Sequence, residues 1–275
     1  MSKPLPEFER PPVIEVVLSV QFERLEALRS PQLGYVWQAF RDRFPNTEEH
    51  PPIEPAFEQF GPKVGVGAGV HFELLSSLPA PRVWFVNAAG TELVQIQQDR
   101  FIRNWRKKAE SDQYPRYLFL RDQFTKDLEQ FQSLVAQQGW GNIEPNQCEI
   151  TYVNVIPAGG GWSVPGELGR VCTLFSPTYS DEGLGIPEEA AVNSRYIISG
   201  DRDVALGRLH VAIAPVVRTT DGSSAFRLSL TARGRLAEMG ADAVLRFLDH
   251  GHESIVRGFA SITTSDMHKL WGRKT

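Results

Sequence analysis

The segment from Gln95 to Lys108 brings polar, basic and aromatic side chains together in a pattern that suits binding. If one strand runs through the segment, alternate residues share a face, which then carries Gln95, Gln97, Asp99, Phe101, Arg103 and Trp105. Arginine and tryptophan stack on bases and basic groups pair with phosphates, so a nucleotide, a peptide or a nucleic-acid strand would each suit it. The alternative is a solvated outer strand whose charges prevent edge-to-edge aggregation. The candidate binding residues are Gln95, Gln97, Asp99, Arg100, Arg103, Asn104, Trp105 and Arg106.

A second group of interest is Asp249-His250-Gly251-His252-Glu253, with His268 downstream, because imidazole and carboxylate groups bind metals. The two histidines His250 and His252 are only two positions apart, so they point to different sides of a helix, and no ligand pair at i, i+4 faces them. The sequence therefore predicts no metal site. It predicts that His252 pairs with Asp249 on a helix surface or faces a partner.

Two glycine-rich stretches lack the context of a phosphate-binding loop. Gly65-Val66-Gly67-Ala68-Gly69 does not lie between a strand and a helix, and Gly159-Gly160-Gly161 is most simply a turn after a strand. The chain contains no G-x-S-x-G, H-E-x-x-H or paired C-x-x-C motif. The sequence thus reveals no catalytic activity and predicts no cofactor, although a spatially assembled Ser, His and Asp set is left open.

Composition favours a cytoplasmic globular protein. The 275 residues are 41% hydrophobic, which is enough for one large or two ordinary cores. Cys148 and Cys172 are too few for a disulfide framework and stand among apolar residues, so we expect buried thiols in a reducing compartment. No apolar stretch has the length of a signal peptide or a membrane span. The net charge of -4 argues against a dedicated nucleic-acid coat but leaves room for a local basic patch.

The first half predicts a strand, a short helix, several strands and a long helix. Apolar and polar residues alternate from Ile14 to Phe22, which is typical of a strand with one face in a core and the other in water. Ser30-Pro31 then opens a helix, which the helical spacing of apolar residues from Leu33 to Phe44 predicts and Pro45 stops. Residues 51–81 predict short strands and loops, 82–86 and 92–98 a hairpin, and 114–139 a long helix.

The second half repeats this order. Residues 148–156 predict a strand, 168–175 a short helix, 208–214 and 226–231 a hairpin, and 244–262 a long closing helix. Both short helices contain the pattern L-G-x-V, at Leu33 and Leu168, with a phenylalanine four residues after the valine. An internal duplication accounts for this better than a single mixed domain with coincidentally similar elements.

We therefore expect an α+β fold of two similar tandem units, residues 1–142 and 143–275, packed as one compact body. The order of elements favours a TBP-like or helix-grip-like arrangement, in which long helices cover one face of a curved sheet. The other face would then be open for a ligand or partner.

Several motifs resemble a sporadically distributed family of bacterial proteins. They are residues 11–22 (PPVIEVVLSVQF), Gln95-x-Gln97 with Asp99-Arg100-Phe101 and Asn104-Trp105-Arg106, Tyr114-Pro115, residues 149–154 (EITYVN), and the ending from Phe259 to Trp271-Gly272. The resemblance spans nearly the whole chain. It implies a bacterial cytoplasmic protein from an accessory gene neighbourhood, such as a defence or toxin–antitoxin locus, and it implies no set of catalytic residues.

From these features we expect a non-enzymatic binding or regulatory protein that presents its sheet face, or the region from Arg100 to Lys108, to a protein partner. One alternative is a small-molecule or nucleotide-binding domain with a pocket between the sheet and a long helix. Another is nucleic-acid binding through the same basic region, with affinity that falls steeply with salt. No association with a membrane is expected.

Overall fold

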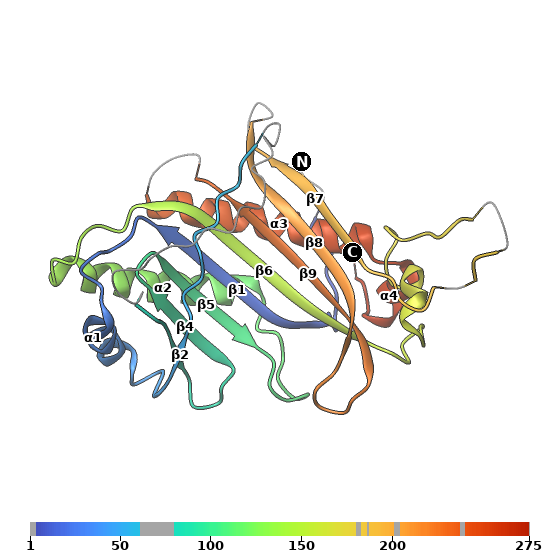
Figure 1. The fold of residues 1–275 in the computed structure, drawn as a ribbon, viewed down its shortest axis with the longest axis horizontal. Helices are drawn as coiled ribbons and strands as arrows, with labels where there is room; N and C mark the ends of the chain where they lie inside the picture. The colour runs from blue at the N-terminus through green and yellow to red at the C-terminus, as the bar shows by residue number, and fades with distance from the viewer. Residues whose placement is uncertain are drawn as a thin grey trace.

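The computed structural model describes residues 4–60, 80–179, 183–185, 187–200, 204–236 and 240–274, and shows an α+β protein built on a large antiparallel sheet (Figure 1). In the described residues the sheet has nine strands in the order β2-β3-β4-β5-β1-β6-β9-β8-β7. The elements are β1 (Val13–Phe22), α1 (Ser30–Phe40), β2 (Asn46–His50), β3 (Arg82–Val86), β4 (Glu92–Gln97), β5 (Arg100–Arg106), α2 (Tyr117–Gln137), β6 (Pro145–Pro157), the 3-10 helix η1 (Pro165–Arg170), β7 (Val192–Ser199), β8 (Ala205–Val217), β9 (Ser224–Gly234), α3 (Ala241–Ile262) and α4 (Ser265–Leu270).

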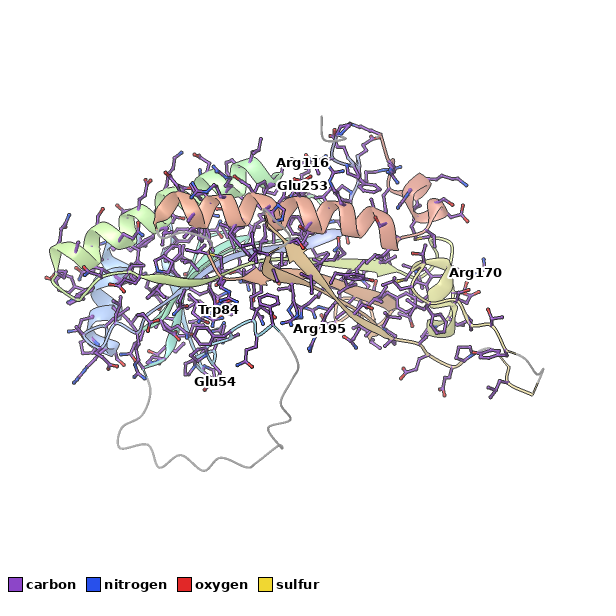
Figure 2. The ribbon with its side chains drawn as sticks, turned by 90° about the horizontal axis from the view of Figure 1, so that it is seen from above. Glu54, Trp84, Arg116, Arg170, Arg195 and Glu253 are labelled. Atoms are coloured by element: carbon purple, nitrogen blue, oxygen red, sulfur yellow. The ribbon has the colours of Figure 1, made fainter. Side chains whose placement is uncertain are left out.

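One face of the sheet is apolar and is covered by α2 and α3 (Figure 2). The alternation in β1 explains this face, because Val16, Leu18 and Val20 all point to it and are at most 1% exposed. Phe101 of β5 meets the α2 residues Phe124 and Phe131 with ring centroids 5.8 and 5.5 Å apart. The helices therefore bury the apolar side of each strand pair, as the sequence predicts for the long helices.

Two glycines of helix α3 face the sheet at positions where the helix packs closely against the strands. A Cβ at Gly251 would lie 2.7 Å from Ile150, and one at Gly258 would lie 2.9 Å from Leu209. A side chain at either position would force the helix or the neighbouring side chain to shift. The close approach ties α3 to β6, β8 and β9.

A continuous hydrophobic cluster extends through both halves of the chain, from Phe8 to Trp271. Cys148 and Cys172 belong to it and are free, buried thiols, as predicted. Burial raises the pKa of Cys148 well above its usual value, so this thiol is inert. The central strands β1 and β6 pair directly and join the two halves in one sheet.

The second face of the sheet is polar, but it is not the water-exposed face expected from the alternation in β1. Ser19 and Gln21 point to this face and are only 4% exposed. Residues 51–60, which we call the strap, cross in front of the sheet without regular secondary structure (Figure 1). The strap therefore covers part of the polar face that the sequence left open.

The predicted hairpins are confirmed, but the segment that starts at Gln95 is not one strand. Gln98 and Asp99 form a turn, and β5 then returns antiparallel to β4 with Gln95 opposite Ile102. The reversal changes which residues share a face. Gln95 and Gln97 face the polar side, whereas Phe101, Arg103 and Trp105 face the helices.

The second short helix is also different from the prediction. Only residues 165–170 are helical, and the backbone of residues 171–173 pairs with the end of α3 instead. Thr173 N donates to Ile262 O at 2.8 Å, and Thr264 N donates to Val171 O at 3.1 Å. Gly169 allows the turn, because a Cβ there would lie 2.9 Å from the carbonyl oxygen of Phe175.

Strands β2 and β7 and helix α4 were not predicted. Both strands lie at edges of the sheet and lack a clean apolar alternation, so the period-two signal is weak. The glycine-rich residues Gly65 to Gly69 lie outside the described residues. In the part of the chain that is described, no helix is long and apolar enough to cross a membrane.

Candidate functional site

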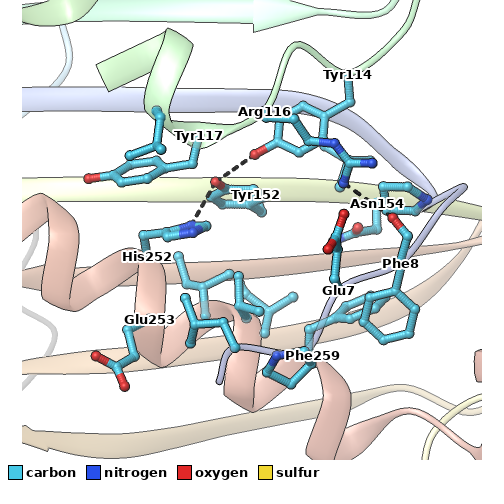
Figure 3. Close-up of a pocket in the computed structure, with 18 of the residues that line it drawn as sticks. Glu7, Phe8, Tyr114, Arg116, Tyr117, Tyr152, Asn154, His252, Glu253 and Phe259 are labelled. Carbon is cyan, nitrogen blue, oxygen red and sulfur yellow. Dashed lines mark hydrogen bonds between the residues drawn. The ribbon is translucent and has the colours of Figure 1, made fainter. Parts of the chain in front are cut away.

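A pocket of about 550 Å³ lies on the helix side of the sheet, between α2, α3 and the central strands (Figure 3). Val13, Tyr152 and Asn154 form part of its floor. The N-terminal segment from Leu5 to Phe8 closes one side, and Phe8 packs edge-on against Phe259 of α3 at a centroid distance of 5.3 Å. The pocket thus combines residues from both halves of the chain.

Three polar side chains in this pocket form a continuous hydrogen-bonded chain. The hydroxyl groups of Tyr114 and Tyr152 lie 2.9 Å apart, and the Tyr152 hydroxyl lies 2.9 Å from Nδ1 of His252 (Figure 3). If Nδ1 accepts, the hydroxyl of Tyr114 donates to Tyr152 and leaves its lone pairs for a ligand. If Nδ1 is protonated, the chain reverses and Tyr114 can donate outward. The same three groups therefore accommodate either a donor or an acceptor.

Burial keeps the three hydrogen-bonded side chains uncharged at neutral pH. It lowers the pKa of His252 to about 4, although Asp249 and Glu253 favour the protonated form. Burial also raises the pKa of Tyr114 to about 12, and it raises the pKa of Tyr152 well above its usual value. The pocket therefore offers hydrogen-bonding groups and not an imidazolium or a phenolate.

His252 is held by α2, in contrast to the prediction that it pairs with Asp249 or faces outward. The Tyr117 ring stacks on the imidazole with centroids 3.9 Å apart and planes 10° from parallel. Asp249 instead accepts hydrogen bonds from the Tyr117 hydroxyl at 2.7 Å and from Arg121 at 2.6 and 2.9 Å. These contacts link α2 to α3 beside the pocket and fix the imidazole between two tyrosines.

Arg116, immediately before α2, has a backbone conformation that is almost exclusive to glycine, with φ 71° and ψ 156°. It is the only non-glycine residue with positive φ in the described part of the chain. Its side chain lines the pocket, donates to the carbonyl of Phe8 at 3.2 Å and lies over the Tyr114 ring. The strain therefore places a guanidinium where it holds the N-terminal segment against the pocket.

The residues predicted for binding are brought together only in part. Arg82, Gln95, Asn104 and Glu15 form a hydrogen-bonded row across β3, β4, β5 and β1, with contacts of 2.6, 2.8 and 2.8 Å. Gln97 donates to Asp99 Oδ1 at 2.5 Å. Gln95 and Asn104, the two members of the predicted set in this row, are buried, and they form hydrogen bonds with each other and with Arg82 and Glu15.

The remaining predicted residues serve other contacts. Arg103 is 2% exposed and forms ion pairs on the helix face with Asp127 at 2.7 Å and Glu92 at 2.5 Å. Arg106 donates to the carbonyl of Gly90 at 2.8 Å. Trp105 packs against Tyr114 with centroids 5.7 Å apart and so supports the pocket wall.

Sequence reasoning did not identify Tyr114, Tyr152 and Arg116 as site residues. Tyr152 is at an inward position of a strand and Tyr114 precedes a proline, so each reads as an ordinary packing residue. The nearest signal was the histidine pair in α3, which was considered for metal binding. No group of three or more His, Cys, Asp or Glu side chains positioned for a metal ion occurs among the residues that the structure describes.

Comparisons with known proteins provide no relative for this chain. No family model matches it, and no match was found among curated proteins or solved structures.

Proposed function

We propose that this protein binds an uncharged small molecule with an aromatic or aliphatic body in the pocket between the sheet and the two long helices. The observation that carries the proposal is the hydrogen-bonded chain of Tyr114, Tyr152 and His252 in an otherwise largely apolar cavity. Ligand pockets typically combine apolar walls with a few polar groups, in volumes of about 300–1,000 Å³. The pocket belongs to this class.

The charges around the pocket favour an uncharged ligand. Asp249 is paired with Arg121, and Glu253 accepts from Arg257 at 2.8 Å. Arg116 already donates to the carbonyl of Phe8. A cationic ligand would therefore meet carboxylates that are already paired, and an anionic ligand would meet only Arg116, which holds the N-terminal segment.

Binding is favoured over acid–base catalysis because the polar chain has the wrong pKa values for proton transfer near neutral pH. A general base or acid works best when its pKa lies near the working pH. The pKa of His252 is lowered to about 4 and that of Tyr114 raised to about 12. The groups therefore suit recognition of a hydrogen-bonding atom.

The test is titration of the full chain with indole, 2-naphthol and 1-octanol, followed by calorimetry and thermal unfolding. We expect saturable binding of at least one probe, with about 2.7 kcal/mol of added stability when its concentration is 100 times Kd. Tyr152→Phe keeps the ring but removes the hydroxyl that links Tyr114 to His252, so binding should weaken about 5–10-fold. Absence of saturable binding by all three probes would count against the proposal.

A variant whose pocket is filled by a larger side chain can be compared with a variant that carries the same substitution outside the pocket. Val256 of α3 lines the pocket, whereas Ser261 of the same helix is exposed. We expect Val256→Phe to abolish binding of the probe and Ser261→Phe to leave it unchanged. Equal binding by the two variants would place the probe elsewhere on the molecule.

We also propose that the fold arose by internal duplication, in the TBP-like or helix-grip-like arrangement predicted from the order of elements. The strand order supports this, because β1, β5, β4, β3 and β6, β9, β8, β7 run outward from the central β1–β6 pair. The short helices differ, since α1 contacts β3 and η1 contacts β9.

A second proposed function is the protein-partner role, in a bacterial cytoplasmic accessory system, that the sequence first suggested. The observation that favours it is the way in which the polar face holds the main chain of the strap. For the nucleic-acid alternative, we expect affinity to fall steeply with salt.

A further inference from the structure

The strap crosses the polar face of the sheet as an extended chain whose alternate residues face the strands. Ala56, Glu58 and Phe60 are partly buried, whereas Phe57 and Gln59 between them are exposed. In Figure 2, Glu54 and Trp84 lie on this face, opposite Arg116 and Glu253 on the helix side. The polar face is thus separate from the pocket, and an inference about it is independent of the pocket ligand.

Side chains of the sheet hold the main chain of the strap. Gln97 accepts from Ile53 N and donates to Ile53 O, both at 2.9 Å. Gln21 accepts from Ala56 N at 2.9 Å. Two arginines donate to strap carbonyls, Arg100 to Glu54 O at 3.2 Å and Arg208 to Gln59 O at 2.7 Å. Hydrogen bonds to main-chain groups do not depend on the side chains of the bound segment, so segments of many sequences could form them.

One side chain of the strap is specifically bound. The Glu58 carboxylate lies 2.6 Å from Arg208 Nη1, 2.5 Å from His210 Nε2 and 3.9 Å from Arg233 Nη1. Its side chain is 7% exposed. Phe60, two positions later, lies under the Arg208 guanidinium at 4.6 Å from the ring centroid. The face thus has a carboxylate site followed by an aromatic contact.

The strap leaves some polar groups of the face unsatisfied. Arg100 Nε and Gln147 Oε1 are buried and have no hydrogen-bond partner among the described residues, and both residues are 6% exposed. They line a space of about 10 Å³ against the methyl group of Ala56. That space is large enough for one oxygen atom. A serine at the position of Ala56 would therefore fit the face better than alanine does.

The strap has few apolar contacts that would hold it permanently on the polar face. No residue from 51 to 60 belongs to the buried core, and Phe57 is 55% exposed. Replacement of the strap by another chain would therefore forfeit mainly hydrogen bonds and ion pairs that the incoming chain can restore.

We infer that the polar face is a docking surface for an extended acidic segment of a partner protein, and that residues 51–60 occupy it in cis. The preferred segment has a small polar residue, a glutamate two positions later and an aromatic residue two positions after that. A peptide is favoured over a nucleic acid because Gln97 contacts both the N–H and the C=O of one residue, a pair that a nucleic-acid backbone lacks.

The test uses a fluorescein-labelled peptide with the sequence of residues 51–60 and measures its anisotropy with the full chain. The tethered strap competes at an effective concentration of roughly millimolar, so the wild-type protein should bind the peptide weakly. The protein variants Glu58→Ala and Ile53→Pro each weaken the strap by a different contact. Both should bind the peptide at least tenfold more tightly than the wild type, provided that circular dichroism shows each to be folded.

Controls locate the peptide on the polar face. Adding Arg208→Ala to the Glu58→Ala protein should weaken binding at least tenfold, whereas Arg227→Ala, at an exposed position of β9, should not. In the peptide, Ala56→Ser should tighten binding about fivefold by adding one hydrogen bond, and Ala56→Val should weaken it.

Failure of either folded variant to bind the peptide at millimolar concentration would overturn the inference. Binding that Arg208→Ala leaves unchanged would also overturn it. A single-stranded DNA 20-mer provides the competing outcome. If the 20-mer displaces the peptide with an affinity that falls steeply with salt, the face is a nucleic-acid site instead.

Discussion

At the scale of single residues, His252 shows how position changes the chemistry of a side chain. It belongs to a polar run of sequence with other potential ligands nearby, but the fold places it between Tyr117 and Tyr152. Desolvation then disfavours its charged form. A residue that resembles a metal ligand in sequence is therefore an uncharged hydrogen-bonding group in the structure.

This burial makes stability depend on pH. The pKa of His252 is about 4 in the folded state and about 6.5 when unfolded, so the unfolded chain binds more protons between these values. Stability from this group is complete above about pH 6.5 and is lost as the pH falls toward 4. We expect the wild type to lose about 1 kcal/mol more than His252→Gln between pH 7.5 and 5.5 in urea unfolding.

The adjacent histidine is the matched control for this measurement. His250 is exposed on the same helix, so His250→Gln should leave the buried imidazole of His252 and its contribution to stability in place. Equal pH dependence in the wild type and His252→Gln would show that the imidazole is not buried in solution.

At the scale of elements, α2 is fixed to the sheet by a buried ionic cluster as well as by its apolar face. Asp127 is fully buried and lies 2.7 Å from Arg103 Nε and 2.5 Å from Arg43 Nη1. Arg43 follows α1 and Arg103 belongs to β5. One carboxylate thus joins three elements.

Removal of this carboxylate should be costly because it leaves Arg103 buried without its main partner. We expect Asp127→Ala to lower the free energy of unfolding by about 3–5 kcal/mol. Asp122→Ala, which breaks the exposed pair with Lys126 on the same helix, should cost about 0.5 kcal/mol or less. Urea unfolding of the two variants tests the difference, and similar costs would contradict the structural role of the cluster.

Elements with a clear periodic pattern were predictable, and those fixed by tertiary contacts were not. The alternation in β1 and the long apolar stripes of α2 and α3 follow directly from burial of one face. The turn at Gln98 and Asp99 has no glycine, proline or asparagine, so the sequence there reads as a continuing strand. The helix expected through Phe175 fails because its backbone groups pair with Ile262 and Thr264, which are distant in sequence.

The candidate site was less predictable than the fold for the same reason. The pocket between sheet and helix was foreseen as a possibility, but its residues come from the N-terminal segment, α2, β6 and α3. Periodicity within one segment does not indicate which residues of distant segments will line the same pocket. Likewise, nothing in residues 51–60 reveals that they fold over Gln97 and Arg208.

At the scale of the whole molecule, the two halves share a sheet and a hydrophobic cluster. β1 pairs with β5 on one side and with β6 on the other, so no break separates residues 1–142 from 143–275. The strap and the pocket also contact both halves. Cooperative unfolding of the whole chain follows from this arrangement.

We therefore expect one unfolding transition, with the same midpoint by far-UV circular dichroism and by tryptophan fluorescence. Hydrogen exchange should give similar opening energies for the amides of β5 and β9, which lie on opposite sides of the central pair. Asp127→Ala, a change in the first half, should lower both energies equally. Separate transitions, or an effect confined to β5, would show that the halves fold independently.

The strap also bridges the two halves between two fixed contact points. Ile53 is hydrogen-bonded to β4 and Glu58 to β8, so the number of residues between Ile53 and Glu58 limits the distance between these two binding points. Inserting one residue between them would shift Glu58 out of its site even though every side chain of the sheet is unchanged. Selection on this segment should therefore act on its length at least as strongly as on its composition.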